Sequence, residues 1–186
     1  LNTNVFTRPD EVMQNIFGVT EYLRRQILAE GGDADRETLN YLKTKNGKFS
    51  YIDSEGQPWR CYRFVENSFC YQKAESPELF YQSALAFGHF LSQLKDYPAD
   101  TLFETIPRFH DTRSRFRDFH KAVMRDIRAR ARYCAPEIRF MMEHEKDCSV
   151  LMDLLEAGRL PLRVTHNDTK LNNVLFDETS GQVLCI

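Results

Sequence analysis

The stretch of sequence that decides the fold runs from Leu162 to Phe176 and reads LRVTHNDTKLNNVLF. Apolar residues lead into its polar centre at Leu162 and Val164, and others lead out of it at residues 174–176. Short apolar runs that border a polar segment are typical of strands. The pattern predicts a loop held between two short strands, where a rigid scaffold can direct polar side chains at a substrate.

The polar centre has the form H-x-D-x-K-x-x-N, and its residue types suit chemistry on a hydroxyl and a phosphate. Asp168 can accept the proton of an attacking hydroxyl, and Lys170 can neutralise charge on a phosphoryl group. Asn173 offers a neutral oxygen ligand to Mg²⁺, a cation that prefers oxygen. We therefore interpret Asp168 and Lys170 as candidate catalytic residues, Asn173 as a candidate metal ligand and His166 as a support of the loop.

A capped turn that arose by chance is the alternative interpretation of this short string, and the residues after the loop argue against it. The strand-like residues 174–176 precede a polar turn with Gly181, and the strand-like residues 183–186 come after that turn. This order predicts a β-hairpin. A loop that leads directly into a hairpin favours the functional interpretation.

The N-terminal part of the chain predicts one long helix and a hairpin. Thr7 is the expected N-cap and Pro9 lies in the expected first turn. Apolar residues then recur at helical spacing as far as Gly31 and Gly32, at Val12, Ile16, Val19, Leu23 and Ile27. Residues 33–45 are polar and mixed. Strands are expected at 49–52 and 59–65, joined by a turn at 53–56.

Three further helices are expected after a break in the pattern near residues 66–68. Ser76 is the expected cap of the first, with an apolar stripe at Phe80, Ala84, Phe87, Leu91 and Leu94. The others are expected at about 111–131 and 136–156, and a strand at 162–165. The order predicts an α+β fold of two lobes. We expect residues 1–66 to form part of a small lobe and residues 67–186 a mainly helical lobe.

Composition narrows the functional class. The 186 residues are 42% hydrophobic and 28% charged, with a formal net charge of −2, so no basic surface argues for nucleic acid. The basic residues of 108–132 alternate with acids, as on a solvated or interdomain helix face. The five cysteines form no metal-binding cluster, which favours reduced thiols and a cytoplasmic location. No apolar run is long enough to span a membrane.

The order of elements and the loop together resemble the kinase-like phosphotransferases of small molecules. This superfamily includes aminoglycoside phosphotransferases and choline, ethanolamine, homoserine and fructosamine kinases. Within it, the chain resembles most the N-acetylhexosamine 1-kinase group. The segments that carry this resemblance are residues 1–6, residues 9–13, Phe109 to Thr112 and Val164 to Asn173. It extends over essentially the whole chain, although only the loop is diagnostic of chemistry.

The resemblance implies a protein-kinase-like fold that uses ATP and Mg²⁺, with Asp168 as base, Lys170 at the phosphate and Asn173 on the metal. It also implies a hinge between the lobes at Phe64, Val65, Glu66 and Asn67, whose backbone would bind adenine. Glu21 would reach toward the phosphate-binding basic residue, or else lie exposed without a role. His110 and Asp111 would contact the acceptor, or else Asp111 or Thr112 would cap the third helix.

The implied function is an ATP- and Mg²⁺-dependent kinase of a small hydroxyl-bearing metabolite, with the anomeric hydroxyl of an N-acetylhexosamine as the expected acceptor. An aminoglycoside, choline, ethanolamine or another amino alcohol is the alternative acceptor, and a non-catalytic pseudokinase-like module is the alternative of another class. The family's phosphate-covering strands, second metal-binding Asp and C-terminal acceptor pocket have no counterpart in the sequence. We therefore expect a fragment without useful kinase activity of its own.

Overall fold

The computed structural model describes residues 1–186 as helices and small antiparallel sheets, which confirms the predicted α+β class. The contacts within the chain define two compact units. The first comprises residues 1–105 and 163–186, and the second comprises residues 106–162. This division does not coincide with the expected boundary at residue 66, so the arrangement in two lobes remains a prediction.

Helix α1 (Pro9–Ala29) is the long helix expected near the N-terminus. It begins at Pro9, and Arg8 rather than Thr7 occupies the N-cap position without a side-chain cap. The expected cap was wrong by one residue because proline fits the first helical position and restricts the residue before it to non-helical conformations. The acids Asp10 and Glu11 lie in the first turn, where they complement the helix dipole.

The buried face of α1 follows the predicted stripe at both ends and departs from it in the middle. Val12, Leu23 and Ile27 are buried as expected. Between them Met13 and Phe17 are buried, whereas Ile16 and Val19 are only partly buried. Met13 and Phe17 face the core beside Val12, which shifts the buried stripe in the first half of the helix.

Two small ladders come after α1. Strand β1 (Tyr41–Leu42) pairs with β4 (Cys61–Tyr62), and β2 (Tyr51–Ile52) pairs with β3 (Pro58–Trp59). The β2–β3 pair confirms the predicted hairpin. The expected strand at 59–65 is instead divided, because β3 and β4 have different partners. Phe17 of α1 packs on Tyr41 of β1, with 6.0 Å between the ring centroids.

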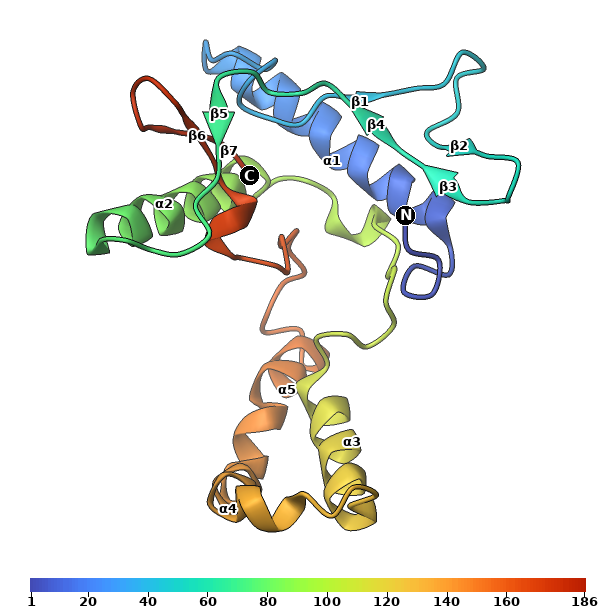
Figure 1. Ribbon diagram of the computed structural model, residues 1–186, viewed down its shortest axis with the longest axis vertical. Coiled ribbons are helices and arrows are strands. Elements are labelled where there is room, and N and C mark those ends of the chain that lie inside the picture. Colours follow the sequence, from blue (N-terminus) through green and yellow to red (C-terminus); the bar gives the residue numbers. More distant parts are fainter. The chain divides into compact units, whose positions relative to one another are not determined.

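The three-stranded sheet consists of β5 (Ser68–Phe69), β6 (Leu175–Asp177) and β7 (Val183–Cys185), in the order β5-β6-β7. Strands β6 and β7 confirm the hairpin predicted after the polar loop. A break between elements was expected near residues 66–68, but strand β5 begins there at Ser68. The strand expected at residues 162–165 does not form. Figure 1 shows α2 (Pro77–Gln93) beside this sheet.

Helix α2 begins as predicted, since the Ser76 side chain accepts a hydrogen bond from the Leu79 N–H at 3.2 Å. Its predicted stripe is correct at Phe87 and Leu94 and wrong at Phe80, Ala84 and Leu91, which are exposed. Apolar residues surround much of this helix, so periodicity alone cannot identify the buried side.

The second unit contains α3 (Thr112–Arg125), α4 (Ala135–Glu143) and α5 (Val150–Glu156). Helix α3 ends before the expected residue 131 because Asp126 adopts a left-handed conformation, with φ of 32°, and accepts the N–H groups of Arg130 and Ala131. The helix expected at 136–156 is interrupted by the 3₁₀ helix η3 (Glu145–Ser149). Residues 143–149 include no Leu, Ile, Val, Met or Phe side chain that could hold a continuous helix against a core.

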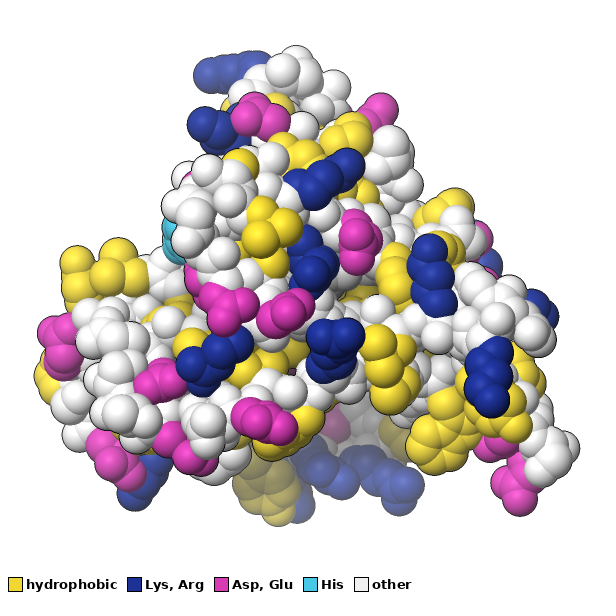
Figure 2. Space-filling view, turned by 90° about the horizontal axis from the view of Figure 1, so that it is seen from above, with side chains coloured by type: hydrophobic (Ala, Val, Ile, Leu, Met, Phe, Trp, Pro, Cys, Tyr) yellow, Lys and Arg dark blue, Asp and Glu magenta, His cyan; other side chains and the backbone are white.

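Two apolar clusters stabilise the first unit. One contains Leu23, Ile27, Ala34, Leu94 and Val164, and the other contains Phe87, Val174 and Phe176. Figure 2 shows acidic and basic side chains interspersed on the face it presents, without a large area of only positive or only negative charge. None of the helices has the length and apolar composition needed to cross a membrane.

Candidate functional site

The predicted loop lies between two anchored residues of the first unit. Val164 and Val174 are buried, one in each apolar cluster, and the polar residues between them are largely exposed. The 3₁₀ helix η4 (Leu171–Asn173) ends the loop immediately before β6. Asn167 has a φ of 64° and its Oδ1 accepts the Thr165 hydroxyl at 2.6 Å, which shapes the turn before Asp168. The loop is thus a polar surface held at both ends by the core.

The structure brings Asp168, Lys170 and Asn173 together. Oδ2 of Asp168 lies 2.9 Å from Nζ of Lys170 and 3.0 Å from Nδ2 of Asn173. Nδ2 of Asn173 also donates to the Asp168 carbonyl oxygen at 2.7 Å. No hydrogen bond is formed by Oδ1 of Asp168. One carboxylate oxygen is therefore fixed, and the other can accept a hydrogen bond from a ligand.

This arrangement keeps Asp168 ionised. The hydrogen bond from Lys170 lowers the pKa of the Asp168 carboxyl below its usual value, and the hydrogen bond from Asn173 adds to this effect. The Asp168 side chain is 54% exposed and the Lys170 side chain is 58% exposed. Asp168 is therefore ionised at neutral pH, and both side chains are accessible from solvent.

The side-chain amide of Asn173 is bound within the loop through its nitrogen. Because its amide nitrogen donates two hydrogen bonds to Asp168, its amide oxygen is left without a protein partner. A neutral oxygen near a carboxylate suits Mg²⁺, which usually takes one or two protein ligands and completes its shell with water and phosphate oxygens. No cluster of three or more His, Cys, Asp or Glu side chains is present to form an all-protein metal site.

His166 packs against helix α2. Its ring meets Phe87 and Phe90 of α2 edge-on, with centroid distances of 5.4 and 5.9 Å. Its Nδ1 atom is buried and has no hydrogen-bond partner. Burial lowers the pKa of the imidazole, so the ring is neutral at pH 7. This packing is consistent with the predicted support of the loop, through apolar contact rather than through a hydrogen bond of Nδ1.

The segment interpreted as a hinge connects β4 to β5. Phe64 is 79% exposed and Val65 is 5% exposed, and the Val65 carbonyl oxygen accepts the Ser68 hydroxyl at 2.6 Å. The structure gives no hydrogen bond to the N–H groups of Val65 and Glu66 or to the carbonyl oxygen of Phe64. The chain itself therefore leaves these main-chain groups unpaired.

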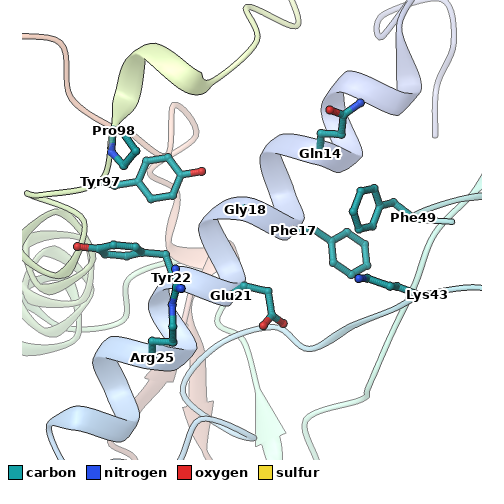
Figure 3. Close-up of a pocket in the computed structure, with 10 residues that line it drawn as sticks. All are labelled: Gln14, Phe17, Gly18, Glu21, Tyr22, Arg25, Lys43, Phe49, Tyr97 and Pro98. Carbon is teal, nitrogen blue, oxygen red and sulfur yellow. The ribbon is translucent and has the colours of Figure 1, made fainter. Parts of the chain in front are cut away.

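Glu21 lies on the exposed side of α1 and contributes to a pocket of about 670 Å³. Figure 3 shows Tyr22 and Tyr97 on one side of α1 and Phe49 and Lys43 on the other. No ion pair involves Glu21 within this chain. The structure thus places Glu21 in an open pocket lined by both aromatic and polar side chains, and a role in nucleotide binding remains a prediction.

His110 and Asp111 belong to the second unit. Asp111 is the N-cap of α3, and its Oδ1 accepts the Ser114 N–H at 2.9 Å. The His110 ring meets the Phe109 ring edge-on at 4.7 Å. The capping alternative is therefore present in the structure, and contact of either residue with an acceptor remains a prediction.

Sequence reasoning missed an ion pair between Arg36 and Asp177. Nη2 of Arg36 lies 2.9 Å from Oδ2 of Asp177 and also donates to the Glu66 carbonyl oxygen at 3.1 Å. Arg36 lies in the polar stretch 33–45, where no periodicity indicates its partners. The run Asp177-Glu178-Thr179-Ser180 did suggest a turn, because Asp side chains commonly accept nearby backbone N–H groups.

A comparison with protein families gives this geometry a context. A model of the phosphotransferase enzyme family matches residues 25–186, which include the loop, the segment between β4 and β5, and all three strands of the β5–β7 sheet. The match covers most of the chain and supports both enzymatic phosphotransfer and the predicted kinase-like fold. The chain belongs to the phosphotransferase enzyme family.

Proposed function

We propose that the protein is an ATP- and Mg²⁺-dependent kinase that phosphorylates a small hydroxyl-bearing metabolite, with Asp168 as the catalytic base. The observation that carries this proposal is the asymmetry of the Asp168 carboxylate. Lys170 and Asn173 hold one oxygen, and the other forms no hydrogen bond. A hydroxyl bound to that oxygen would be oriented for attack and would lose its proton to the carboxylate.

The depressed pKa of Asp168 defines its role more closely. A weakly basic carboxylate removes a proton efficiently only when the hydroxyl has become acidic, that is, late in its attack on phosphorus. Asp168 therefore serves mainly to orient the hydroxyl, and proton transfer follows bond formation. Positioning and charge stabilisation are the main contributions that proteins make to phosphoryl transfer.

Lys170 and Asn173 provide the charge stabilisation in this proposal. The Lys170 ammonium can move from Asp168 to an oxygen of the transferring phosphoryl group, because its side chain is 58% exposed. Asn173 would hold Mg²⁺ through the amide oxygen that has no protein partner. When bound, Mg²⁺ neutralises phosphate charge. The unpaired main-chain groups of residues 64–66 would receive adenine, and Glu21 would face the phosphate-binding part of the nucleotide site.

For the acceptor we propose the anomeric hydroxyl of an N-acetylhexosamine, on the resemblance carried by residues 1–6, 9–13, 109–112 and 164–173. We place the reaction in the cytoplasm, because all five cysteines are unpaired and free thiols suit a reducing compartment. His110 and Asp111 are the proposed acceptor contacts from the second unit.

The test is Mg²⁺-dependent release of ADP by the natural protein. N-acetylglucosamine, N-acetylgalactosamine, choline and an aminoglycoside would be supplied in turn, beside a reaction without acceptor. Turnover with the two N-acetylhexosamines alone is the expected result. Turnover with choline or the aminoglycoside would replace the proposed acceptor, and ATP binding without any turnover would favour a pseudokinase-like module.

A further inference from the structure

One guanidinium joins three segments of the first unit that are far apart in the sequence. Arg36 lies after α1 in the chain, and its Nη2 contacts Asp177 at the end of β6 at 2.9 Å. The same nitrogen lies 3.1 Å from the Glu66 carbonyl oxygen and 3.5 Å from the Asn67 carbonyl oxygen. Arg36 therefore connects the region after α1 with both the segment before β5 and the hairpin that comes after the catalytic loop.

The carboxylate that Arg36 contacts is held firmly in place. Oδ1 of Asp177 accepts the N–H groups of Thr179 and Ser180 at 3.0 and 2.8 Å, and it also accepts the Ser180 hydroxyl. The Asp177 side chain is 14% exposed and the Arg36 side chain is 36% exposed. A charge-assisted hydrogen bond to a fixed, partly desolvated carboxylate is stronger than the usual surface ion pair.

The segment beside Arg36 bends sharply at Glu66 and Asn67. Asn67 has a φ of 52°, a left-handed conformation that Asn tolerates better than most residues. Its carbonyl oxygen accepts the Glu178 N–H at 3.0 Å in addition to the Arg36 contact. Arg36 and Glu178 thus hold the carbonyl groups that adjoin the unpaired N–H groups of Val65 and Glu66.

We propose that Arg36 is a positioning residue of the nucleotide site, which aligns the main chain of residues 64–66 for the adenine base. It does so by holding the Glu66 and Asn67 carbonyl groups against Asp177, on the strand that comes directly after Asn173. The inference rests on the proposed function, since it assigns adenine to this segment. Arg36 itself touches no substrate.

The test compares four variants of the natural protein. Arg36→Met removes the guanidinium, and Arg36→Lys keeps the charge without the planar fork. Asp177→Asn keeps an oxygen for the Thr179 and Ser180 N–H groups and removes the charge that faces Arg36. Arg8→Met is the matched control, because Arg8 also forms an ion pair, with Glu11, and has no contact with residues 64–67. Calorimetry would measure the Kd for adenosine and for tripolyphosphate, and steady-state kinetics would give KM for ATP and kcat.

In Arg36→Met we expect the Kd for adenosine to rise by about tenfold, on the scale of one lost charge-assisted hydrogen bond, and the Kd for tripolyphosphate to change by less than about twofold. KM for ATP should rise more than kcat falls. Asp177→Asn should show the same pattern more weakly, Arg36→Lys should recover part of the loss, and Arg8→Met should match the wild type.

Two results would overturn this inference and leave the proposed function standing. The first is wild-type adenosine binding that is unchanged in Arg36→Met. The second is an equal loss of adenosine and tripolyphosphate binding together with a lowered Tm, which would indicate a general structural role. If Arg36→Met does not fold, Arg36→Lys and Asp177→Asn give the same comparison. A wild-type protein that binds no nucleotide would overturn the proposed function, and this inference with it.

Discussion

At the scale of single residues, the proposed catalytic loop positions its polar side chains by local hydrogen bonds. Asp168, Lys170 and Asn173 lie within six residues, and the hydrogen bonds among them require no other segment. This is why sequence reasoning could select them. The lowered pKa of Asp168 and the free oxygens of Asp168 and Asn173 could not be predicted in the same way, because they depend on which of the two Asp168 oxygens the neighbours contact.

Lys170 should control the acid limb of the pH–rate profile. Its hydrogen bond is the main cause of the lowered pKa of Asp168, so Lys170→Met should raise that pKa. The ionised carboxylate would then be lost at a higher pH, and the acid limb of kcat/KM would move upward in pH. Lys121→Met is the control, because Lys121 pairs with Asp118 in the second unit. An acid limb that does not move in Lys170→Met would argue that Asp168 is not the titrating base.

Contacts between residues that are far apart in the sequence could not be predicted from the sequence. Arg36 reaches Glu66 and Asp177 only because the chain folds those segments together. Nothing in the polar stretch 33–45 distinguishes Arg36 from Arg24 or Arg25 in the preceding helix. A role of this kind becomes visible only in three dimensions.

At the scale of elements, prediction succeeded where the signal is local. Pro9 and the apolar spacing marked α1, Ser76 marked the start of α2, and the turn after Asp177 marked the β6–β7 hairpin. It failed for β1 and β5, which are two residues long and pair with strands far along the chain. Such short strands are stabilised by their partners rather than by their own β-propensity.

The cap of α3 gives a test at the scale of elements. Asp111→Ala should lower the free energy of unfolding by about 1 kcal/mol, because it leaves the Ser114 N–H without its partner. Asp111→Asn should cost far less, since Asn is an equally good cap. Urea denaturation of both variants would measure this difference. If Asp111→Asn kept its stability and raised KM for the acceptor, Asp111 would be an acceptor contact as well as a cap.

At the scale of the whole molecule, apolar burial is unequal between the two units. The first contains two apolar clusters, in which Ile27, Leu94, Val174 and Phe176 are almost completely buried, and Met13 is completely buried as well. In the second, Phe116 is the only buried hydrophobic residue, and Met124, Ile127 and Tyr133 are at least 71% exposed. The sequence did not reveal this difference, because the helices of both units have apolar stripes.

Hydrogen–deuterium exchange of the 186-residue chain should reflect this inequality. Amide protection follows local burial and packing, so α1 and β6 should exchange slowly, whereas α4 and α5 should exchange quickly. Neither α4 nor α5 contains a buried residue, although both are helical. Equal protection of α1 and α4 would show that the second unit is stabilised by something other than its own core.

The central claim is that Asp168 is the base of a phosphotransferase, and Asp168→Asn tests it most directly. Asn keeps the size of the side chain and one oxygen, and it removes the basic group. In the natural protein, with its best acceptor, we expect kcat to fall by about 10²–10⁴-fold while the Kd for ATP stays within about twofold of the wild type. A variant that retains full kcat with normal ATP binding would contradict the account.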